Sequence, residues 1–181
     1  HLNLETIDIY YMHELELSMK YYGAEKFYKK LKDIVIAYEN MVDEGKIREY
    51  GMATWDAFQL DPKDEKYISL EKVMEVVQSV RSNHHFKHLM VSINLKNRLC
   101  VENKNQKYKD DVLTIIECAK KYNVEIHISG PLGQGEAKDY LEVKEYIRYL
   151  VEKSGCDSYF IGTKNINHLK ENIEITKELL D

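Results

Sequence analysis

Short apolar segments alternate with segments of helical periodicity along the whole chain. The apolar segments are rich in β-branched and aromatic residues, as buried strands are, and lie at 6–12, 47–54, 88–95, 124–130 and 158–162. The intervening segments repeat apolar residues every three or four positions and predict helices at 27–42, 69–82, 110–123, 138–155 and 167–180. Strands that alternate with helices form a parallel sheet with right-handed crossovers, so we predict an α/β fold.

Individual residues indicate how two of these helices begin or end. Gly45 stands where a left-handed residue would end the first helix. In the third, Asp110 and Asp111 fall in the predicted first turn, and Lys120 and Lys121 in the last, which matches the helix dipole.

Two parallel architectures compete, an open doubly wound sheet and a (β/α)8 barrel. The open sheet usually has a glycine-rich phosphate loop after its first strand, and "MHELEL" at 12–17 has no glycine. Polar candidates for a functional site follow the strands instead, at their carboxyl ends: His13, Thr54, Asn94, Ser129 and Thr163. That placement favours the barrel, although five strands cannot close a barrel of eight.

Composition excludes some partners. The chain has 181 residues, enough for one domain, and a formal net charge of −5, whereas a nucleic-acid surface is usually basic. The basic run "KFYKKLK" at 26–32 is interpreted as a solvated helix face. No apolar run approaches the roughly 20 residues of a membrane span, so we expect no membrane partner. Three cysteines without regular spacing favour a reducing compartment, and we expect a cytoplasmic protein.

Histidine and cysteine spacing predicts no metal site. His84, His85 and His88 lie close in sequence, but no carboxylate or cysteine stands at ligand spacing beside them. Cys100 lies in a polar segment predicted to be a loop, where an idle thiol is the simpler interpretation and a reactive one the alternative. Trp55 is interpreted either as packing or as the lining of a substrate pocket.

Four motifs, in order, resemble the aldo-keto reductase family. They are "IDIYYMH" at 7–13, "MVDEGKIREYGMAT" at 41–54, "ISGPLGQG" at 128–135 and "FIGTKNINHLKEN" at 160–172. "MATW" at 52–55 is similar to the branch whose fifth strand ends in Ala-Thr-Trp. The resemblance implies a (β/α)8 TIM barrel of aldo-keto reductase type, of which residues 1–181 form the portion from strand four to strand eight as a single domain.

The resemblance implies NADPH-dependent reduction of aldehyde or ketone carbonyls. The family's catalytic tetrad is Asp, Tyr, Lys and His, and only the histidine maps onto this chain, as His13. The other three come from earlier strands of the barrel. We therefore expect the 181-residue chain alone to be inactive. Because the chain begins with His1, and because the segment after Gly135 passes quickly into a helix, either residues are missing from the sequence or that loop is short.

The resemblance also implies a set of NADP(H)-binding residues. Thr163 and Lys164 would hold the 2′-phosphate, and Glu171 and Asn172 the adenine. His168 stands where the family often has arginine. Near the nicotinamide, the family's Ser, Asn and Gln are replaced by Ala53, Thr54 and Met90, of which only Thr54 can hydrogen-bond. The pyrophosphate and the ribose would be held by Ser129, Gly130, Pro131, Leu132 and Gln134. Gly162 belongs to the motif at the start of the last helix, which would attract a phosphate.

Two further interpretations stay open. The replaced nicotinamide-binding residues favour a noncatalytic nucleotide-binding or regulatory module. A half-barrel that pairs with another chain would cover the bare edges of an open parallel sheet. The sequence upstream of this portion would distinguish the enzyme from the binding module. A full-length protein with the tetrad Asp, Tyr and Lys is expected to be an enzyme, and one that lacks the Tyr or the Lys is expected only to bind.

Overall fold

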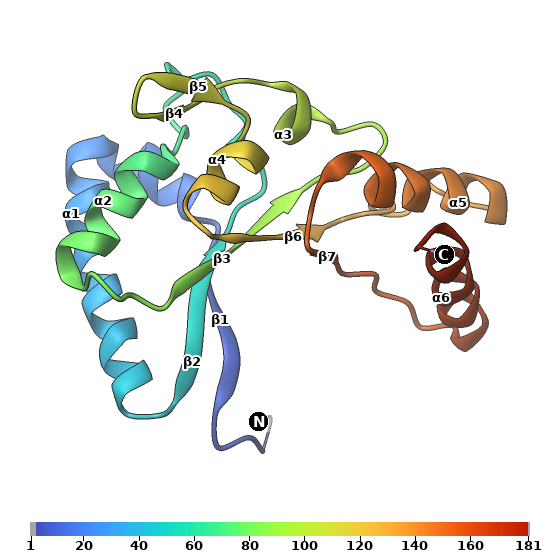
Figure 1. Ribbon diagram of the computed structural model, residues 1–181, viewed down its shortest axis with the longest axis horizontal. Helices are drawn as coiled ribbons and strands as arrows, with labels where there is room; N and C mark the ends of the chain where they lie inside the picture. The colour runs from blue at the N-terminus through green and yellow to red at the C-terminus, as the bar shows by residue number, and fades with distance from the viewer. Residues whose placement is uncertain (1–2, 181) are drawn as a thin grey trace.

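The computed structural model describes residues 3–180, so His1 lies outside the described residues. Its centre is a five-stranded sheet in the order β1-β2-β3-β6-β7, with every neighbouring pair parallel (Figure 1). The strands are β1 (Ile7–His13), β2 (Ile47–Ala53), β3 (Phe86–Ser92), β6 (Glu125–Ser129) and β7 (Ser158–Tyr159). The prediction of a parallel α/β sheet is confirmed.

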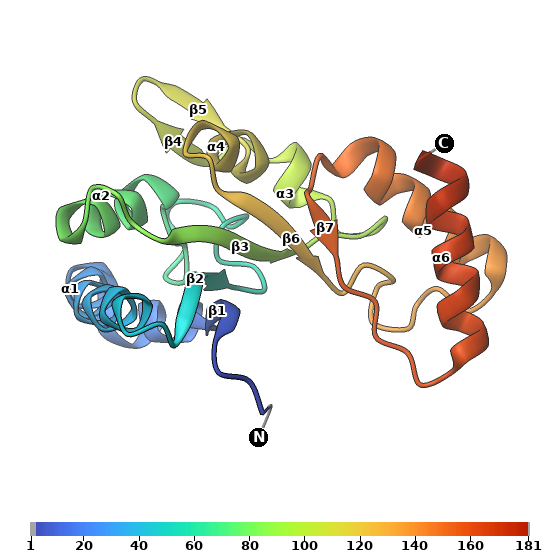
Figure 2. The same ribbon diagram turned by 60° about the horizontal axis from the view of Figure 1, so that its bottom comes forward.

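The helices follow the strands around one face of this sheet (Figures 1 and 2). They are α1 (Leu15–Asp43), α2 (Leu70–Val80), α3 (Leu99–Glu102), α4 (Ile115–Lys121), α5 (Tyr140–Tyr149), which continues as the π-helical turn η1 (Leu150–Ser154), and α6 (Ile166–Leu180). No helix of residues 3–180 covers the opposite face, and the sheet does not close into a barrel. Nor is any helix within that range long and apolar enough to cross a membrane.

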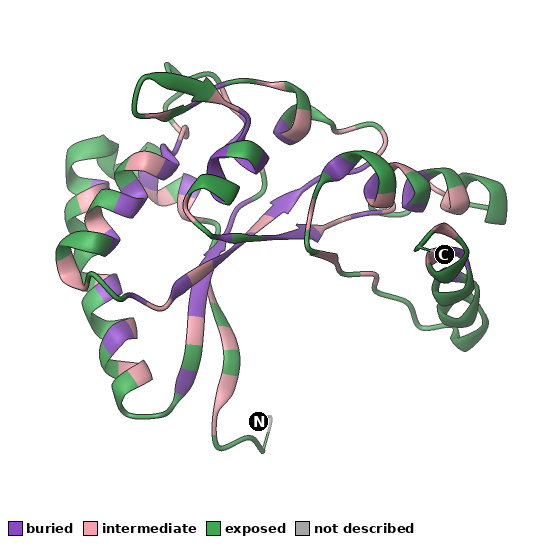
Figure 3. Cartoon of the chain, in the orientation of Figure 1, coloured by how far each residue is buried: buried purple, intermediate pink, exposed green. Residues whose placement is uncertain are grey.

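The core lies between the sheet and its helices, as the burial colouring of Figure 3 shows. Alternate residues of the strands, among them Tyr50, Met52, Leu89 and Ile126, point to the helices and are almost completely buried. Their neighbours in sequence point to the uncovered face, because side chains alternate along a strand. The sheet therefore has an apolar face under the helices and a more polar face that is open in this chain.

Gly51 on β2 allows an unusually close approach to β3. A Cβ atom at this position would lie 2.0 Å from the backbone oxygen of His88. The strand pairing is irregular at this point, between Tyr50 and Gly51. Only glycine fits this contact without displacing backbone.

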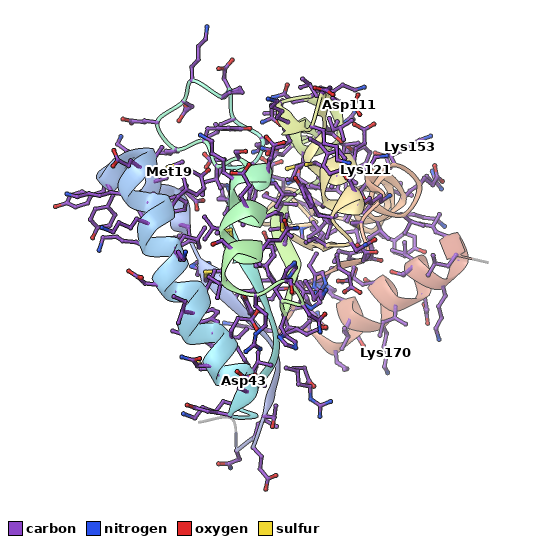
Figure 4. The ribbon with its side chains drawn as sticks, turned by 60° about the vertical axis from the view of Figure 1, so that its left-hand side comes forward. Met19, Asp43, Asp111, Lys121, Lys153 and Lys170 are labelled. Atoms are coloured by element: carbon purple, nitrogen blue, oxygen red, sulfur yellow. The ribbon has the colours of Figure 1, made fainter. Side chains whose placement is uncertain are left out.

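Helix α1 begins earlier than its apolar stripe predicts and has two parts. Gly23, with φ 72° and ψ 162°, interrupts the helical backbone between residues 15–22 and 24–43. Figure 4 labels a residue of each part, Met19 and Asp43. As predicted, Gly45 ends the helix: its φ is 71°, and its N–H donates to the Val42 oxygen at 2.9 Å.

The helix predicted at 110–123 is wrong in its first turn. Strands β4 (Gln106–Tyr108) and β5 (Asp111–Leu113) form an antiparallel hairpin, so Asp110 and Asp111 lie in and beside its turn. The helix starts after Thr114, whose side chain and that of Glu117 form a reciprocal capping box. The acidic pair is therefore a turn signal here, while the last-turn lysines are placed as predicted.

Gln106 ties this hairpin to the body of the molecule. Its side chain is completely buried; its amide nitrogen donates to the oxygens of Phe58 and Ile68 at 2.9 and 3.2 Å. Its amide oxygen accepts from the Leu70 N–H at 2.9 Å. Two backbone oxygens of the segment between β2 and α2, and the first N–H of α2, thus find their partners in one glutamine.

The last strand is shorter than predicted. β7 ends at Tyr159 instead of residue 162, and the Phe160 N–H makes the final bond to β6, to the Ile128 oxygen at 3.0 Å. The chain then leaves the sheet, so residues 161–165 form a connection to α6.

Candidate functional site

Three predicted site residues lie at the carboxyl ends of parallel strands. His13 is the last residue of β1 and is exposed. Thr54 follows β2; its N–H donates to the Met90 oxygen at 3.0 Å, while its buried hydroxyl oxygen has no partner within the described part of the chain. Ser129 ends β6 and its hydroxyl contacts the Val91 oxygen at 3.4 Å.

A cleft of about 630 Å³ lies between the loop after β6, the start of α5, the connection after β7 and the first turns of α6. Nine of the predicted nucleotide-binding residues line it: Gly130, Pro131, Leu132, Gln134, Gly162, Thr163, His168, Glu171 and Asn172. They come from two segments about 30 residues apart in sequence, which the fold brings together. Lys164, Thr54 and Ser129 do not line the cleft.

The loop after β6 is a run of tight turns. Gly130, Gly133 and Gln134 have positive φ angles of 60°, 64° and 56°, and the Gly133 N–H donates to the Gly130 oxygen at 3.0 Å. A Cβ atom on Gly130 would lie 3.3 Å from the Trp55 ring. The tryptophan therefore packs against this loop and links the end of β2 to the wall of the cleft.

The amino end of α6 faces the same cleft. Asn165 caps this end, since its side-chain oxygen accepts the Asn167 N–H at 2.9 Å, and the Thr163 hydroxyl accepts the Asn165 N–H at 3.1 Å. His168 and Asn172 line the cleft one turn apart. The positive end of a 15-residue helix dipole favours an anion here.

Both signs of charge border the cleft. Lys138 and His168 offer cationic or protonatable groups, and Asp139 and Glu171 offer carboxylates. Asp139 already accepts the N–H groups of Leu141 and Glu142 at 3.0 Å each, as the cap of α5. The cleft can therefore hold a ligand that has a phosphate group at one end and hydrogen-bonding groups at the other.

Comparisons with known proteins give matches at the level of structure. No protein-family profile matches the chain, and no curated protein matches it. Two solved structures from Pseudomonas aeruginosa, both assigned as aldo-keto reductases, are 18% and 17% identical, with TM-scores of 0.61 and 0.59. Each covers 99% of this chain, and the chain covers 53% and 55% of theirs. An aldo-keto reductase from Brucella melitensis is 12% identical, with a TM-score of 0.58, and the match covers 96% of this chain and 56% of that one.

The chain has the fold of an aldo-keto reductase. It spans about half the length of the solved structures that it matches, in agreement with its open sheet and with the portion of the barrel expected from its motifs.

His13 and the cleft are at opposite sides of this partial aldo-keto reductase barrel. β1, which carries His13, and β7, which leads to the cleft, are the two edge strands of the sheet. The sheet therefore does not bring the histidine to the cleft within the described residues.

Sequence reasoning missed a buried carboxylate near the edge of the sheet. Glu16, 5% exposed, follows β1 at the start of α1, and its Oε1 accepts the backbone N–H of Trp55 at 2.7 Å. Its Oε2 has no hydrogen-bond partner among residues 3–180. The letters "HELE" at 13–16 gave no reason to separate it from Glu14, which is exposed. Phe160 and Tyr140, which line the cleft, were also missed.

Two statements about histidine and cysteine need correction. In space His88 does have carboxylates beside it: its Nε2 lies 2.8 Å from a Glu49 oxygen, and Glu125 and His127 complete a potential ligand group. Spacing along the chain hides this group because its members come from different strands. Cys100 lies on α3, buried, and its thiol contacts the Gln59 side-chain oxygen at 3.2 Å. Burial raises the pKa of this thiol to about 12, which makes it inert.

Proposed function

We propose that this chain forms the cofactor-binding half of an NADPH-dependent aldo-keto reductase that reduces aldehyde or ketone carbonyls. The observation that carries the proposal is the cleft, where nine residues selected by family resemblance gather from two separate segments. In this proposal the protein is cytoplasmic and its partner is a small carbonyl compound, with no nucleic acid or membrane.

The residues of the cleft fit an adenosine phosphate. Thr163 and His168, with Lys164 beside them, would meet the 2′-phosphate at the positive end of α6. Glu171 and Asn172 would accept and donate hydrogen bonds to the adenine edge. The turns between Gly130 and Gln134 would follow the pyrophosphate, and Leu132 and Phe160 would provide apolar contacts.

NADPH, when bound, supplies the hydride. Negative charge then develops on the carbonyl oxygen, and a positioned donor must stabilise it. His13 would orient that carbonyl by a hydrogen bond. In the family, the proton comes from a tyrosine on an earlier strand of the barrel. We therefore expect turnover only in a protein as long as the structural relatives, which would include that strand.

One observation favours a second candidate, a noncatalytic nucleotide-binding module. Ala53 and Met90 are paired in the sheet and present a methyl group and a thioether where the family binds the nicotinamide amide. The Thr54 hydroxyl beside them is buried. A dinucleotide held only at its adenosine end would bind without productive orientation.

A binding titration tests the proposal. NADPH and NADH would be added separately to the 181-residue chain and followed by nicotinamide fluorescence and calorimetry. We expect NADPH to bind more tightly. His168→Ala and Lys164→Ala should each weaken NADPH binding several-fold and leave NADH binding nearly unchanged. Lys177→Ala, near the carboxyl end of the same helix, is the matched control and should change neither.

Equal binding of both nucleotides by all variants, or no binding, would refute the assignment of the cleft. A protein of the relatives' length separates the two candidates: carbonyl-dependent oxidation of NADPH that is lost in His13→Ala indicates the reductase. Binding without turnover indicates the module.

A further inference from the structure

The uncovered face of the sheet carries a cluster that the proposed function does not use. His88 on β3 and Glu125 on β6 are directly paired in the sheet, and His127 lies two residues beyond Glu125 on the same face. His88 Nδ1 is 3.3 Å from Glu125 Oε2, and His127 Nε2 is 3.5 Å from the same oxygen. The three ligand atoms all lie within 4.8 Å of one another.

These separations match those of ligands around a zinc ion. Zinc binds imidazole nitrogen at about 2.0–2.1 Å and carboxylate oxygen at about 2.0–2.2 Å, usually in tetrahedral geometry. Two ligand atoms at such distances and at a tetrahedral angle are about 3.3–3.5 Å apart. Both histidine nitrogens stand at that separation from Glu125 Oε2 before any ion is added.

The outer nitrogen of each ring already has a partner. His88 Nε2 lies 2.8 Å from Glu49 Oε2, and His127 Nδ1 lies 3.0 Å from the Tyr11 hydroxyl. If each outer nitrogen carries the proton and donates it, the lone pairs of His88 Nδ1 and His127 Nε2 are free. A carboxylate in the position of Glu49 commonly fixes the orientation of a metal-binding histidine, and the Tyr11 hydroxyl can accept from His127 in the same way.

His88 provides an independent indication of a ligand. Its side chain is almost completely buried, yet its Nδ1, although close to Glu125, makes no hydrogen bond of acceptable geometry in the described part of the chain. A buried polar atom without a partner is unfavourable, so it calls for an explanation. A cation between this nitrogen and Glu125 would satisfy it.

We propose that His88, Glu125 and His127 bind a divalent transition-metal ion, with zinc as the best fit. Two imidazoles and one carboxylate leave the fourth tetrahedral position open, as in catalytic rather than structural zinc sites. Glu49 and Glu125 have exposed side chains, which gives the ion a route from solvent, and their charges offset that of the ion.

Metal titration of the 181-residue chain tests this site without reference to nucleotide binding. The chain would be freed of metal with a chelator and titrated with Co²⁺, whose visible absorption reports tetrahedral coordination, and then with Zn²⁺ in competition. We expect one ion per chain. Zn²⁺ should also raise the melting temperature, since the assembled site of the folded state binds it more tightly than the unfolded chain does.

Three variants locate the ion. Glu125→Gln and His127→Gln should each weaken binding by at least about 100-fold, and Glu49→Ala, which removes the hydrogen-bond partner of His88 Nε2, by about 10–100-fold. Glu152→Gln, an exposed carboxylate on η1, is the matched control and should bind as the native chain does. Circular dichroism of each variant checks folding. Because Glu125 is exposed, its variant should fold even if a histidine variant does not.

Two results would overturn the proposal. One is the absence of a tetrahedral Co²⁺ spectrum and of a Zn²⁺-dependent rise in melting temperature, which would indicate a metal-free network in which His127 donates directly to Glu125. The other is unchanged affinity in Glu125→Gln, or a thiolate charge-transfer band, which would place the ion elsewhere.

Discussion

Glu39 of α1 is a buried carboxylate whose replacement should be costly. It is 2% exposed. Its Oε1 accepts the Tyr50 hydroxyl at 2.8 Å and the His85 N–H at 2.9 Å, and its Oε2 lies 2.9 Å from both His85 Nδ1 and Arg81 Nη1. The carboxylate thus joins α1 to β2 and to the start of β3.

The Glu39→Gln variant keeps the shape and removes the charge. Its amide oxygen can still accept from Tyr50 and from the His85 backbone, but its NH2 group cannot accept from His85 Nδ1 or Arg81. A hydrogen bond to a charged group contributes about 1.5–3 kcal/mol, and the partly exposed Arg81 pair contributes well under 1 kcal/mol. We expect the free energy of unfolding to fall by about 2–3 kcal/mol at pH 7.

The pH dependence gives a second test. Burial raises the pKa of Glu39, but the hydrogen bonds from His85 and Tyr50 outweigh it and leave the pKa below its ordinary value of 4.5. The carboxylate therefore stabilises the fold fully above the ordinary pKa, and this contribution is lost as the pH falls through the lower value of the folded state. In Glu39→Gln that acid-dependent loss should be absent.

Urea unfolding, followed by circular dichroism and by the fluorescence of the single tryptophan, measures both effects. Glu44→Gln, which removes an exposed carboxylate from the end of α1, is the control and should change stability by less than about 0.5 kcal/mol. If Glu39→Gln were as stable as the native chain, or kept the native acid dependence, the assigned role of this carboxylate would be wrong.

Three further predictions concern the fold. Gly51→Ala should destabilise the chain by at least about 2 kcal/mol in urea, because the new methyl group meets the His88 backbone, whereas Gly162→Ala, with open space around it, should be close to neutral. Gln106→Leu should lower the unfolding free energy by about 2–4 kcal/mol, since it leaves buried backbone groups without partners; a calorimetric melting temperature equal to the native one would contradict this. Cys100 should react with a thiol reagent at pH 8 only when the chain unfolds, and rapid labelling of the native protein, located by mass spectrometry, would show that its environment is misassigned.

The sequence predicts the sheet well because its strands carry strong local signals. Each strand is short, β-branched or aromatic, and lies between turn residues, and all five are found within three residues of their predicted ends. The β4–β5 hairpin gave no such signal, since its strands have three residues each and are largely polar. Gln106 holds it in place through contacts distant in sequence, which no local pattern contains.

The two sites differ in how far sequence could predict them. The residues of the cleft fall in two continuous motifs, so resemblance identified most of them together. His88, Glu125 and His127 come from two strands separated by α3, the β4–β5 hairpin and α4, and they meet only through the β3–β6 pairing. Their ring orientations depend on Tyr11 and Glu49 from two further strands. Such a cluster has no spacing rule.

The interruption at Gly23 divides α1 into two segments that make different contacts. Residues 24–43 hold Glu39 and pack along the sheet, whereas residues 15–22 carry Glu16, whose carboxylate fixes the Trp55 backbone and hence the position of the tryptophan against the loop at Gly130. Because the backbone at Gly23 is not helical, we expect the first segment to open while the second stays closed. Amide hydrogen exchange should then be faster in 15–22 than in 24–43. The wall of the cleft would loosen at a free-energy cost set by this short segment rather than by global unfolding.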